Sequence, residues 1–152
     1  MKNKIKINLS VPYFFGNEAR YLSQCIKSEW ISSSGKFIDE FERNISKKLK
    51  IKYAVACINC TAALHLSIKL LEPQQGDEII VPTFTYIATV NVIKYVGANV
   101  KFVDSKLSTW QIDENLLPKI ITSKTKAIIA PHIYGQSCEM TKLKKICNKK
   151  KI

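Results

Sequence analysis

Long hydrophobic runs are absent from this chain of 152 residues. No apolar stretch approaches the roughly 18 residues that a membrane-spanning helix needs. The basic residues near the start, Lys2, Lys4 and Lys6, are not followed by the apolar segment of a signal peptide. These absences argue against a membrane span and against secretion, and we expect a cytoplasmic protein.

Acidic residues are scarce, because 12 of them stand against 24 lysines and arginines, which gives a formal net charge of +12. Half of this excess comes from the lysines of residues 141–152, a stretch without a single acid. The basic stretches contain no arginine cluster, no interleaved aromatic residues and no recognisable nucleic-acid motif. We therefore interpret the excess as a solvated lysine-rich surface and expect no specific nucleic-acid partner.

The number of cysteines is odd, five in all, and the sequence shows no secretion signal. We therefore expect free thiols and no disulfide framework. The spacing Cys57-Ile-Asn-Cys60 is that of a thioredoxin-like redox motif, but no proline or tryptophan flanks it. A zinc site would need a second such pair or a His/Cys pair at ligand spacing, and the sequence has neither. Buried thiols are our main interpretation, and a CxxC redox protein is kept as an alternative.

The remaining composition, 46% hydrophobic and 24% charged residues, is that of an ordinary globular domain. Short apolar runs alternate with longer periodic segments, which predicts an α/β fold with a mainly parallel sheet and flanking helices. The predicted strands are residues 53–58, 78–81, 99–103 and 125–130, and the predicted helices are residues 61–71, 84–95, 113–121 and 139–148. Two more helices, at residues 16–27 and 37–49, precede this array. We therefore divide the chain into an N-terminal segment, 1–50, and a βα-repeat region, 51–152.

The first candidate site is the segment Asn59-Cys60-Thr61-Ala62-Ala63, where a predicted strand turns into a helix. Ligands of open α/β sheets bind beyond the carboxyl ends of the strands, and a helix N-terminus offers free N–H groups to a phosphate. Small residues keep this backbone accessible, and Thr61 adds a hydroxyl donor. The alternative is a plain capped helix with Asn59 or Thr61 as the N-cap, because the glycines of a P-loop are absent.

Further candidates follow the next strands at the same edge of the sheet. Tyr86 comes after the strand at 78–81, and an aromatic face above a phosphate pocket suits a planar heterocycle, although such a ring also packs in cores. His132 and Tyr134 come after the strand at 125–130, in positions for a general acid or base and for a hydrogen-bond donor. No serine or cysteine occupies a nucleophile position beside them, which disfavours a hydrolase triad.

Taken together, these stretches resemble the DegT/DnrJ/StrS family, the pyridoxal-phosphate-dependent sugar aminotransferases of fold type I. The resemblance runs in order from Val11 to Ile152, and its strongest segments are residues 30–42, 59–66, 76–89, 97–104 and 125–136. It implies the N-terminal part of the large domain of that fold, truncated, with the small C-terminal domain absent. Such enzymes move an amino group, typically from glutamate, onto a keto-sugar carried on a nucleoside diphosphate.

The resemblance also implies roles for individual residues. Cys60, Thr61 and Ala62 correspond to the step that holds the phosphate of pyridoxal 5'-phosphate (PLP), and Tyr86 corresponds to the aromatic residue that stacks over its pyridine ring. The substrate-binding residues that the resemblance implies are Ser33, Ser34, His132 and Tyr134.

Two residues that the family's chemistry requires are not in this sequence. The lysine that holds the cofactor covalently and the aspartate that pairs with the pyridine nitrogen lie downstream of the matching segment, and Lys124 and Lys126 match the beginning of a strand instead. We therefore expect a fragment that does not transaminate alone and that binds PLP weakly or not at all. The full-length form is expected to be a homodimer. A non-catalytic basic binding module is kept as the alternative from another class.

Overall fold

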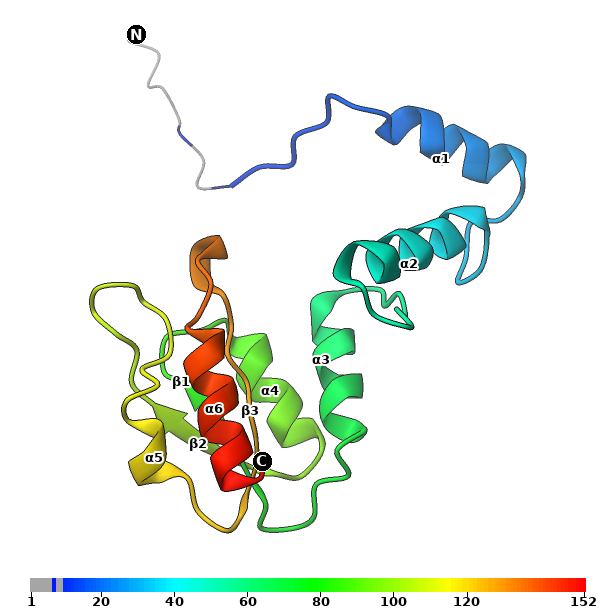
Figure 1. Cartoon of the computed structure of the whole chain (residues 1–152). Helices are drawn as coiled ribbons and strands as arrows, with labels where there is room; N and C mark the ends of the chain where they lie inside the picture. Colours follow the sequence, from blue (N-terminus) through cyan, green and yellow to red (C-terminus); the bar gives the residue numbers. More distant parts are fainter. Residues whose placement is uncertain (1–6, 8–9) are drawn as a thin grey trace, which may run out of the picture. The chain divides into compact units, whose positions relative to one another are not determined.

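The computed structural model describes residue 7 and residues 10–152, so that Lys2, Lys4 and Lys6 lie outside the described residues. The chain divides into two compact units, of which the first ends at Ala56 and the second is Cys57–Ile152 (Figure 1). The division at residue 50 stays a prediction about domains. None of the helices in the described part of the chain is both long and apolar enough to cross a membrane.

The first unit contains the two helices that the periodicity predicts, α1 (Glu18–Lys27) and α2 (Lys36–Leu49). Neither helix contains a buried residue. Tyr21 of α1 and Phe37 of α2 place their ring centroids 5.0 Å apart, a distance typical of stabilising aromatic pairs. This contact joins the two helices within the unit.

The second unit is built on a parallel sheet of three strands, β1 (Glu78–Pro82), β2 (Asn99–Val103) and β3 (Thr125–Ile128). Their order is β2-β1-β3, and β1 pairs in parallel with both neighbours. The last four residues of β1 are buried, as expected for a central strand of a parallel sheet. The predicted α/β class with a parallel sheet is therefore confirmed.

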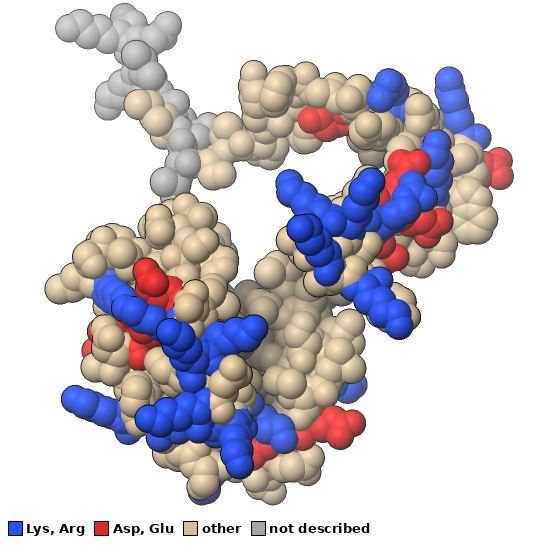
Figure 2. Space-filling model, in the orientation of Figure 1, with Lys and Arg blue, Asp and Glu red and all other residues tan. Residues whose placement is uncertain are grey.

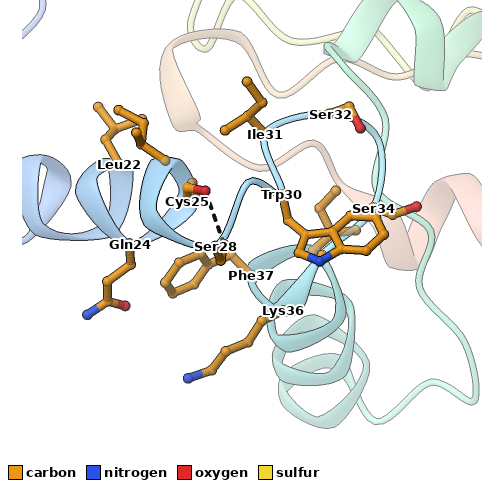
Figure 3. Close-up of a pocket in the computed structure, with 13 residues that line it drawn as sticks. Leu22, Gln24, Cys25, Ser28, Trp30, Ile31, Ser32, Ser34, Lys36 and Phe37 are labelled. Atoms are coloured by element: carbon orange, nitrogen blue, oxygen red, sulfur yellow. Dashed lines mark hydrogen bonds between the residues drawn. The ribbon is translucent and has the colours of Figure 1, made fainter.

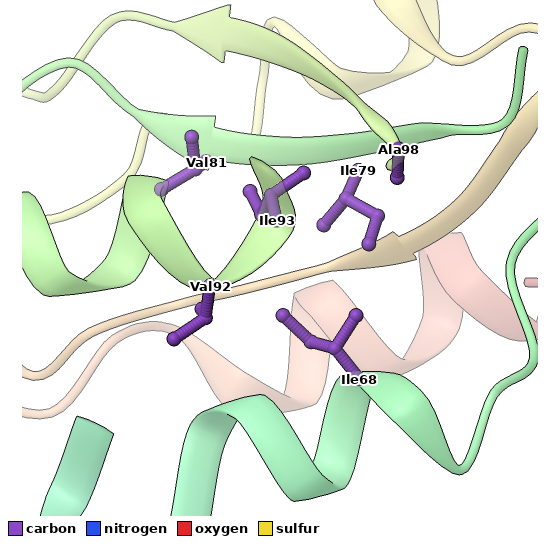
Figure 4. Packing of buried hydrophobic residues seen from close by; sticks show 6 residues of the cluster. All are labelled: Ile68, Ile79, Val81, Val92, Ile93 and Ala98. Atoms are coloured by element: carbon purple, nitrogen blue, oxygen red, sulfur yellow. The ribbon is translucent and has the colours of Figure 1, made fainter. Parts of the chain in front are cut away.

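Helices flank both faces of this sheet. Because alternate residues of β1 point to opposite faces, the strand contributes side chains to two separate cores. Ile79 and Val81 pack into one core with side chains from α3 and α4, as Figure 4 shows, whereas Ile80 packs into a second core with side chains from α5 and α6. The helices concerned are α3 (Cys60–Lys69), α4 (Ile87–Tyr95), α5 (Leu117–Ile120) and α6 (Met140–Lys150).

The predicted strand at residues 53–58 is wrong. This segment has no regular secondary structure and pairs with no strand in the described part of the chain. Tyr53 and Val55 keep 72% and 75% of their surface exposed, and the N–H of Ala56 donates to the carboxylate of Glu42 at 2.7 Å instead of joining a ladder. An apolar run becomes a strand only where a neighbouring strand accepts its backbone hydrogen bonds, and the run itself does not reveal that neighbour.

The predicted helix at residues 113–121 is also too long, since α5 begins only at Leu117. Asp113 accepts the N–H of Asn115 at 3.0 Å with its own carboxylate, which holds a local turn in place of a helical start. The other predicted helices and strands agree with the observed ones to within a few residues.

Candidate functional site

A cavity of about 660 Å³ lies at the carboxyl edge of the sheet. It is formed where α3 begins, where the β1–α4 loop ends and where the chain leaves β3. β1 and β3 are neighbours in the sheet but not in the sequence, and open α/β sheets bind ligands at such switch points. The residues that line the cavity are Asn59, Cys60, Thr61, Leu64, Thr85, Tyr86, Ala88, Thr89, Ile129, Ala130, Pro131, His132, Ile133 and Tyr134.

Five residues that the sequence singled out come together in this cavity. They are Cys60, Thr61, Tyr86, His132 and Tyr134. Three others are not among its lining residues: Ala62, Ser33 and Ser34. The parallel pairing of β1 and β3 brings Tyr86 to His132 and Tyr134, because both strands end at the same edge. Cys60 and Thr61 reach the cavity from the start of α3. Roles of these residues toward a ligand stay predictions.

The start of α3 provides free backbone donors. Asn59 is its N-cap, and the side-chain Oδ1 accepts the N–H of Ala62 at 2.8 Å. The N–H of Ala62, which the resemblance implies for phosphate binding, is therefore already engaged. The N–H groups of Cys60 and Thr61 have no hydrogen-bond partner among the residues that the structure describes. These two donors and the Thr61 hydroxyl are what the helix start offers to an anion.

Tyr86 is the N-cap residue of α4, and the residue is 82% exposed. This exposure rules out the alternative in which the ring packs in the core. Beside it, Thr85 donates from Oγ1 to the Oγ1 of the buried Thr89 at 3.0 Å, which ties the loop to the helix that follows. The ring is thus accessible, and the loop that carries it is tied to α4.

His132 is oriented by a backbone hydrogen bond. Its Nδ1 accepts the N–H of Cys138 at 3.2 Å. A ring nitrogen that accepts a hydrogen bond carries no proton, so the neutral imidazole holds its proton on Nε2. The nitrogen left for a ligand is therefore Nε2, which acts as a hydrogen-bond donor.

Three aromatic rings from separate loops cluster beside the cavity. Phe84 lies between the other two, with its ring centroid 5.2 Å from that of Trp110 and 6.4 Å from that of Tyr134. Both Trp110 and Tyr134 have a left-handed backbone, with φ of 63° and 54°. This conformation costs roughly 1–2 kcal/mol for a non-glycine residue. It persists only where the surroundings hold it in place.

No charged side chain lines this cavity in the part of the chain that the structure describes. An anion there would meet the partial positive charge of the α3 N-terminus, about half an elementary charge, together with hydroxyl and N–H donors. The many lysines lie elsewhere: those of α6 are exposed and gather on the side of the second unit that faces the viewer in Figure 2.

Cys57 and Cys60 are not joined by a disulfide in the structure, and both residues are exposed. The expectation that this pair is buried is wrong, because Cys57 lies in the exposed stretch before α3 and Cys60 is the exposed first residue of that helix. The expectation of free thiols stays a prediction. Among the described residues, no group of three or more histidine, cysteine or acidic side chains could hold a metal ion. A redox role of the pair stays a separate hypothesis.

A second cavity, of about 450 Å³, lies within the first unit between the end of α1 and the start of α2 (Figure 3). Ser34 and Trp30 line it, whereas Ser33 does not. Gly35 has a φ of 138°, and a Cβ added to it would lie 3.1 Å from the Cβ of Trp30. Only glycine allows the chain to turn into α2 so close to the indole.

Sequence reasoning missed several residues of the first cavity. Thr85 lies just before α4 and Thr89 in its first turn, and their spacing of four positions is a signal from which they could have been found. Ile129 and Ala130 carry no such signal, because they contribute only apolar surface and backbone beyond the end of β3.

Comparison with known proteins gives a consistent result. Residues 14–152 match the model of the DegT/DnrJ/EryC1/StrS aminotransferase family. Over 132 residues the chain is 46% identical to the GDP-perosamine synthase of Escherichia coli O157:H7, a match that covers 87% of this chain and 36% of that protein.

Solved structures show the same similarity. The aminotransferase from Psychrobacter cryohalolentis matches with a TM-score of 0.86 at 30% identity, over 93% of this chain and 36% of that one. The Escherichia coli GDP-4-keto-6-deoxy-D-mannose-3-dehydratase with bound hydrated PLP matches with a TM-score of 0.85 at 27% identity, over 95% and 38%. The chain thus spans little more than a third of the length of these relatives, and its fold is that of the N-terminal part of a fold-type I aminotransferase.

The residues of the cavity fit PLP held without a covalent bond. The volume lies within the roughly 300–1,000 Å³ that is usual for small-molecule sites. Two free N–H groups and the Thr61 hydroxyl suit the phosphate, and the exposed ring of Tyr86 suits the pyridine. No lysine and no carboxylate is among the described residues that line the cavity, so these residues supply neither a covalent attachment nor a partner for the pyridine nitrogen.

Proposed function

Because the chain belongs to the DegT/DnrJ/EryC1/StrS aminotransferase family, we propose that it is the N-terminal, cofactor-binding part of an aminotransferase that acts on a nucleotide-linked keto-sugar. One observation supports this most directly. The free N–H groups at the start of α3 and the exposed ring of Tyr86 share one cavity at the carboxyl edge of the sheet. A phosphate donor set beside an aromatic face is what a phosphorylated heterocycle requires.

Each residue of the cavity then has a distinct task. Cys60 and Thr61 hold the phosphate through their N–H groups, and the Thr61 hydroxyl adds a third donor. Tyr86 covers one face of the ring, and His132 donates from Nε2 to an oxygen of cofactor or substrate. PLP, when bound, supplies the electron sink for the carbanion of amino transfer.

The sugar is proposed to be carried on a nucleoside diphosphate, and glutamate is proposed as the amino donor. Relatives named GDP-perosamine synthase and GDP-4-keto-6-deoxy-D-mannose-3-dehydratase favour a GDP-linked keto-sugar in amino-sugar biosynthesis. One of these names describes a dehydratase. We propose amino transfer for this chain because the family model that matches residues 14–152 is that of aminotransferases.

The chain alone is proposed to be catalytically incompetent. The described residues of its cavity include no lysine that could hold the cofactor covalently, and the chain spans 36% of the length of its perosamine-synthase relative. A homodimer of the full-length form and a cytoplasmic location belong to the same proposal.

Replacing Thr61 with valine is expected to weaken PLP binding about ten- to a hundredfold, because the exchange removes a hydrogen bond to a charged phosphate, worth about 1.5–3 kcal/mol. The measurement is a fluorescence titration of the purified chain with PLP and, in parallel, with pyridoxal, which lacks the phosphate. Pyridoxal is expected to bind much more weakly than PLP and to show no difference between wild type and variant.

Thr141→Val is the matched control, since Thr141 is the second residue of α6 as Thr61 is of α3. Its affinity for PLP should equal that of the wild type. We propose that the chain alone holds PLP, weakly but saturably, without a covalent bond. Saturable binding that Thr61→Val leaves unchanged, or no saturable binding at all, contradicts this proposal. Borohydride reduction of the PLP mixture checks the second half of the proposal, because a stoichiometric label on one particular lysine would show that the chain has its own covalent site.

A further inference from the structure

Gln111 is only 4% exposed, although it lies in the irregular segment between β2 and α5 and does not line the PLP cavity. Its amide makes four hydrogen bonds. Nε2 donates to the carbonyl oxygens of Thr109 at 3.1 Å and Ile133 at 3.0 Å. Oε1 accepts the N–H of Ile133 at 3.1 Å and the thiol of Cys138 at 3.4 Å. Every donor and acceptor position of the amide is thus used.

The two bonds to Ile133 copy the pairing of a β-ladder. One side-chain amide engages both the N–H and the C=O of Ile133, as the backbone of a neighbouring strand would. Ile133 lies beyond the end of β3, where no strand among the described residues pairs with the chain. It separates His132 from Tyr134, so the residue that Gln111 holds is the one between two residues of the cavity.

Cys138 fastens the other end of the same segment. Its buried thiol has one proton, which Oε1 of Gln111 shares with the carbonyl oxygen of Pro131 at 3.2 Å from Sγ, while its N–H donates to Nδ1 of His132. Burial raises the pKa of this thiol, so that it keeps the proton that it donates. Gln111 therefore holds the segment 131–138 at Ile133. Cys138 connects the end of the segment back to its first two residues, Pro131 and His132.

Strained backbone lies directly beside this network. Trp110 precedes Gln111, and Tyr134 follows Ile133, and both have positive φ. Residues adopt this conformation stably only where neighbouring contacts over-determine them. The network next to them provides such contacts, and it places both aromatic rings against Phe84.

We infer that Gln111 is a positioning residue of the PLP cavity: its buried amide holds Ile133 and thereby fixes where His132 and Tyr134 stand in the cavity wall. The effect on the wall is independent of any ligand. The effect on PLP affinity rests on the proposed function. The two effects are therefore measured separately.

The test compares Gln111→Met with the wild type. Methionine keeps the length and approximate volume of the side chain but forms none of the four hydrogen bonds. Amide hydrogen exchange followed by NMR should show Ile133 exchanging at least about tenfold faster, while the amide of Ile129, which donates to the carbonyl of Ile80 in the sheet, keeps its rate. Gln136→Met, an exposed exchange on the same segment, is the matched control and should change neither rate.

A spectroscopic signature accompanies the exchange data. Trp30 and Trp110 are the two tryptophans of the chain, so a Trp30→Phe background leaves Trp110 as the reporter of its contact with Phe84. Gln111→Met in this background should shift the emission of Trp110 toward that of a solvent-exposed indole. A variant that acts only by a general loss of stability would not produce such a shift under conditions where the sheet amides keep their protection.

Several outcomes overturn the inference. One is an Ile133 amide that exchanges like an unstructured peptide already in the wild type. Another is a Gln111→Met variant in which Ile133 keeps its protection. If Gln111→Met fails to fold, the same exchange measurement is made on Gln111→Glu. Glutamate keeps an acceptor for the N–H of Ile133 and loses the donor to its carbonyl oxygen. Faster exchange confined to residues 131–138 supports the inference, whereas equal acceleration across the sheet, or failure of this variant to fold as well, overturns it.

The ligand arm is independent of the exchange arm. Gln111→Met is expected to weaken PLP binding about three- to tenfold without any contact between Gln111 and the ligand. If the wild type shows no saturable PLP binding, the proposed function fails, and Ile133 exchange still decides the positioning role. If PLP binds and Gln111→Met leaves its affinity unchanged while Ile133 exchange accelerates, the positioning role is overturned and the proposed function stands.

Discussion

Replacing Ile79 or Ile80 with alanine is expected to lower the free energy of unfolding by about 3 kcal/mol in either case, within the range of about 2–5 kcal/mol for such exchanges in cores. Both side chains are 0% exposed, and they point to opposite faces of the sheet. Each truncation therefore opens a cavity in a different core. Urea unfolding followed by circular dichroism measures the change.

The matched control is Ile58→Ala, which removes the same atoms from a side chain that is 92% exposed. Its effect should stay within about 0.5 kcal/mol. Ile79→Val and Ile80→Val provide smaller steps of about 1 kcal/mol if the alanine variants are too unstable to measure. If Ile80→Ala lowered the free energy of unfolding by no more than Ile58→Ala does, the side of the sheet covered by α5 and α6 would not be a packed core.

The same two isoleucines explain why the sheet could be predicted from the sequence. A central strand of a parallel sheet is buried on both faces, so it reads as a continuous apolar run, and residues 79–81 are Ile-Ile-Val. Thr61 and Tyr86 could be found for different reasons. Tyr86 follows β1, whose end lies at the same edge of the sheet as the end of β3. Thr61 could be found from the small residues at a predicted helix start, and the helix is observed although the strand predicted before it is not.

The segment at 53–58 and the role of Gln111 could not be predicted, because each depends on partners that local sequence does not contain. The apolar run at 53–58 reads like that at 78–81 but pairs with no strand among the described residues. Gln111 and Ile133 are 22 positions apart, and what Gln111 binds there is backbone, which every residue has. Contacts of this kind leave no pattern of residue types in a single sequence.

Glu114 is a second buried polar residue without a sequence signal. It is 1% exposed, and its carboxylate receives hydrogen bonds from Lys106 at 2.6 Å and from Lys142 at 3.2 Å. It thus links the segment after β2 to the first turn of α6. Burial by itself would raise the pKa of Glu114, but the hydrogen bonds from the two lysines and from the backbone outweigh it, and the pKa lies below its ordinary value of 4.5.

Glu114→Gln is expected to lower the free energy of unfolding by about 2–3 kcal/mol at pH 7, because the charge-assisted hydrogen bonds of a buried group are lost. Its lowered pKa determines how this loss depends on pH. The carboxylate stabilises the fold fully above the pKa of the unfolded chain, and this contribution disappears as pH falls through the lower pKa of the folded state. The difference between wild type and variant should therefore be constant above about pH 5.5 and shrink steadily below pH 4.5.

Two comparisons make the result specific to Glu114. Glu78 also has a lowered pKa, through hydrogen bonds from Thr122 and Lys101, but it titrates in both proteins and cancels in the difference. Glu40→Gln breaks the exposed pair with Lys36, whose closest atoms are 3.7 Å apart, and should cost less than about 1 kcal/mol. If the stability difference at Glu114 persisted unchanged down to pH 3, the stabilisation would come from packing of the side chain and not from its charge. In that case Lys106 and Lys142 would not hold α6 to the segment after β2 by ion pairing.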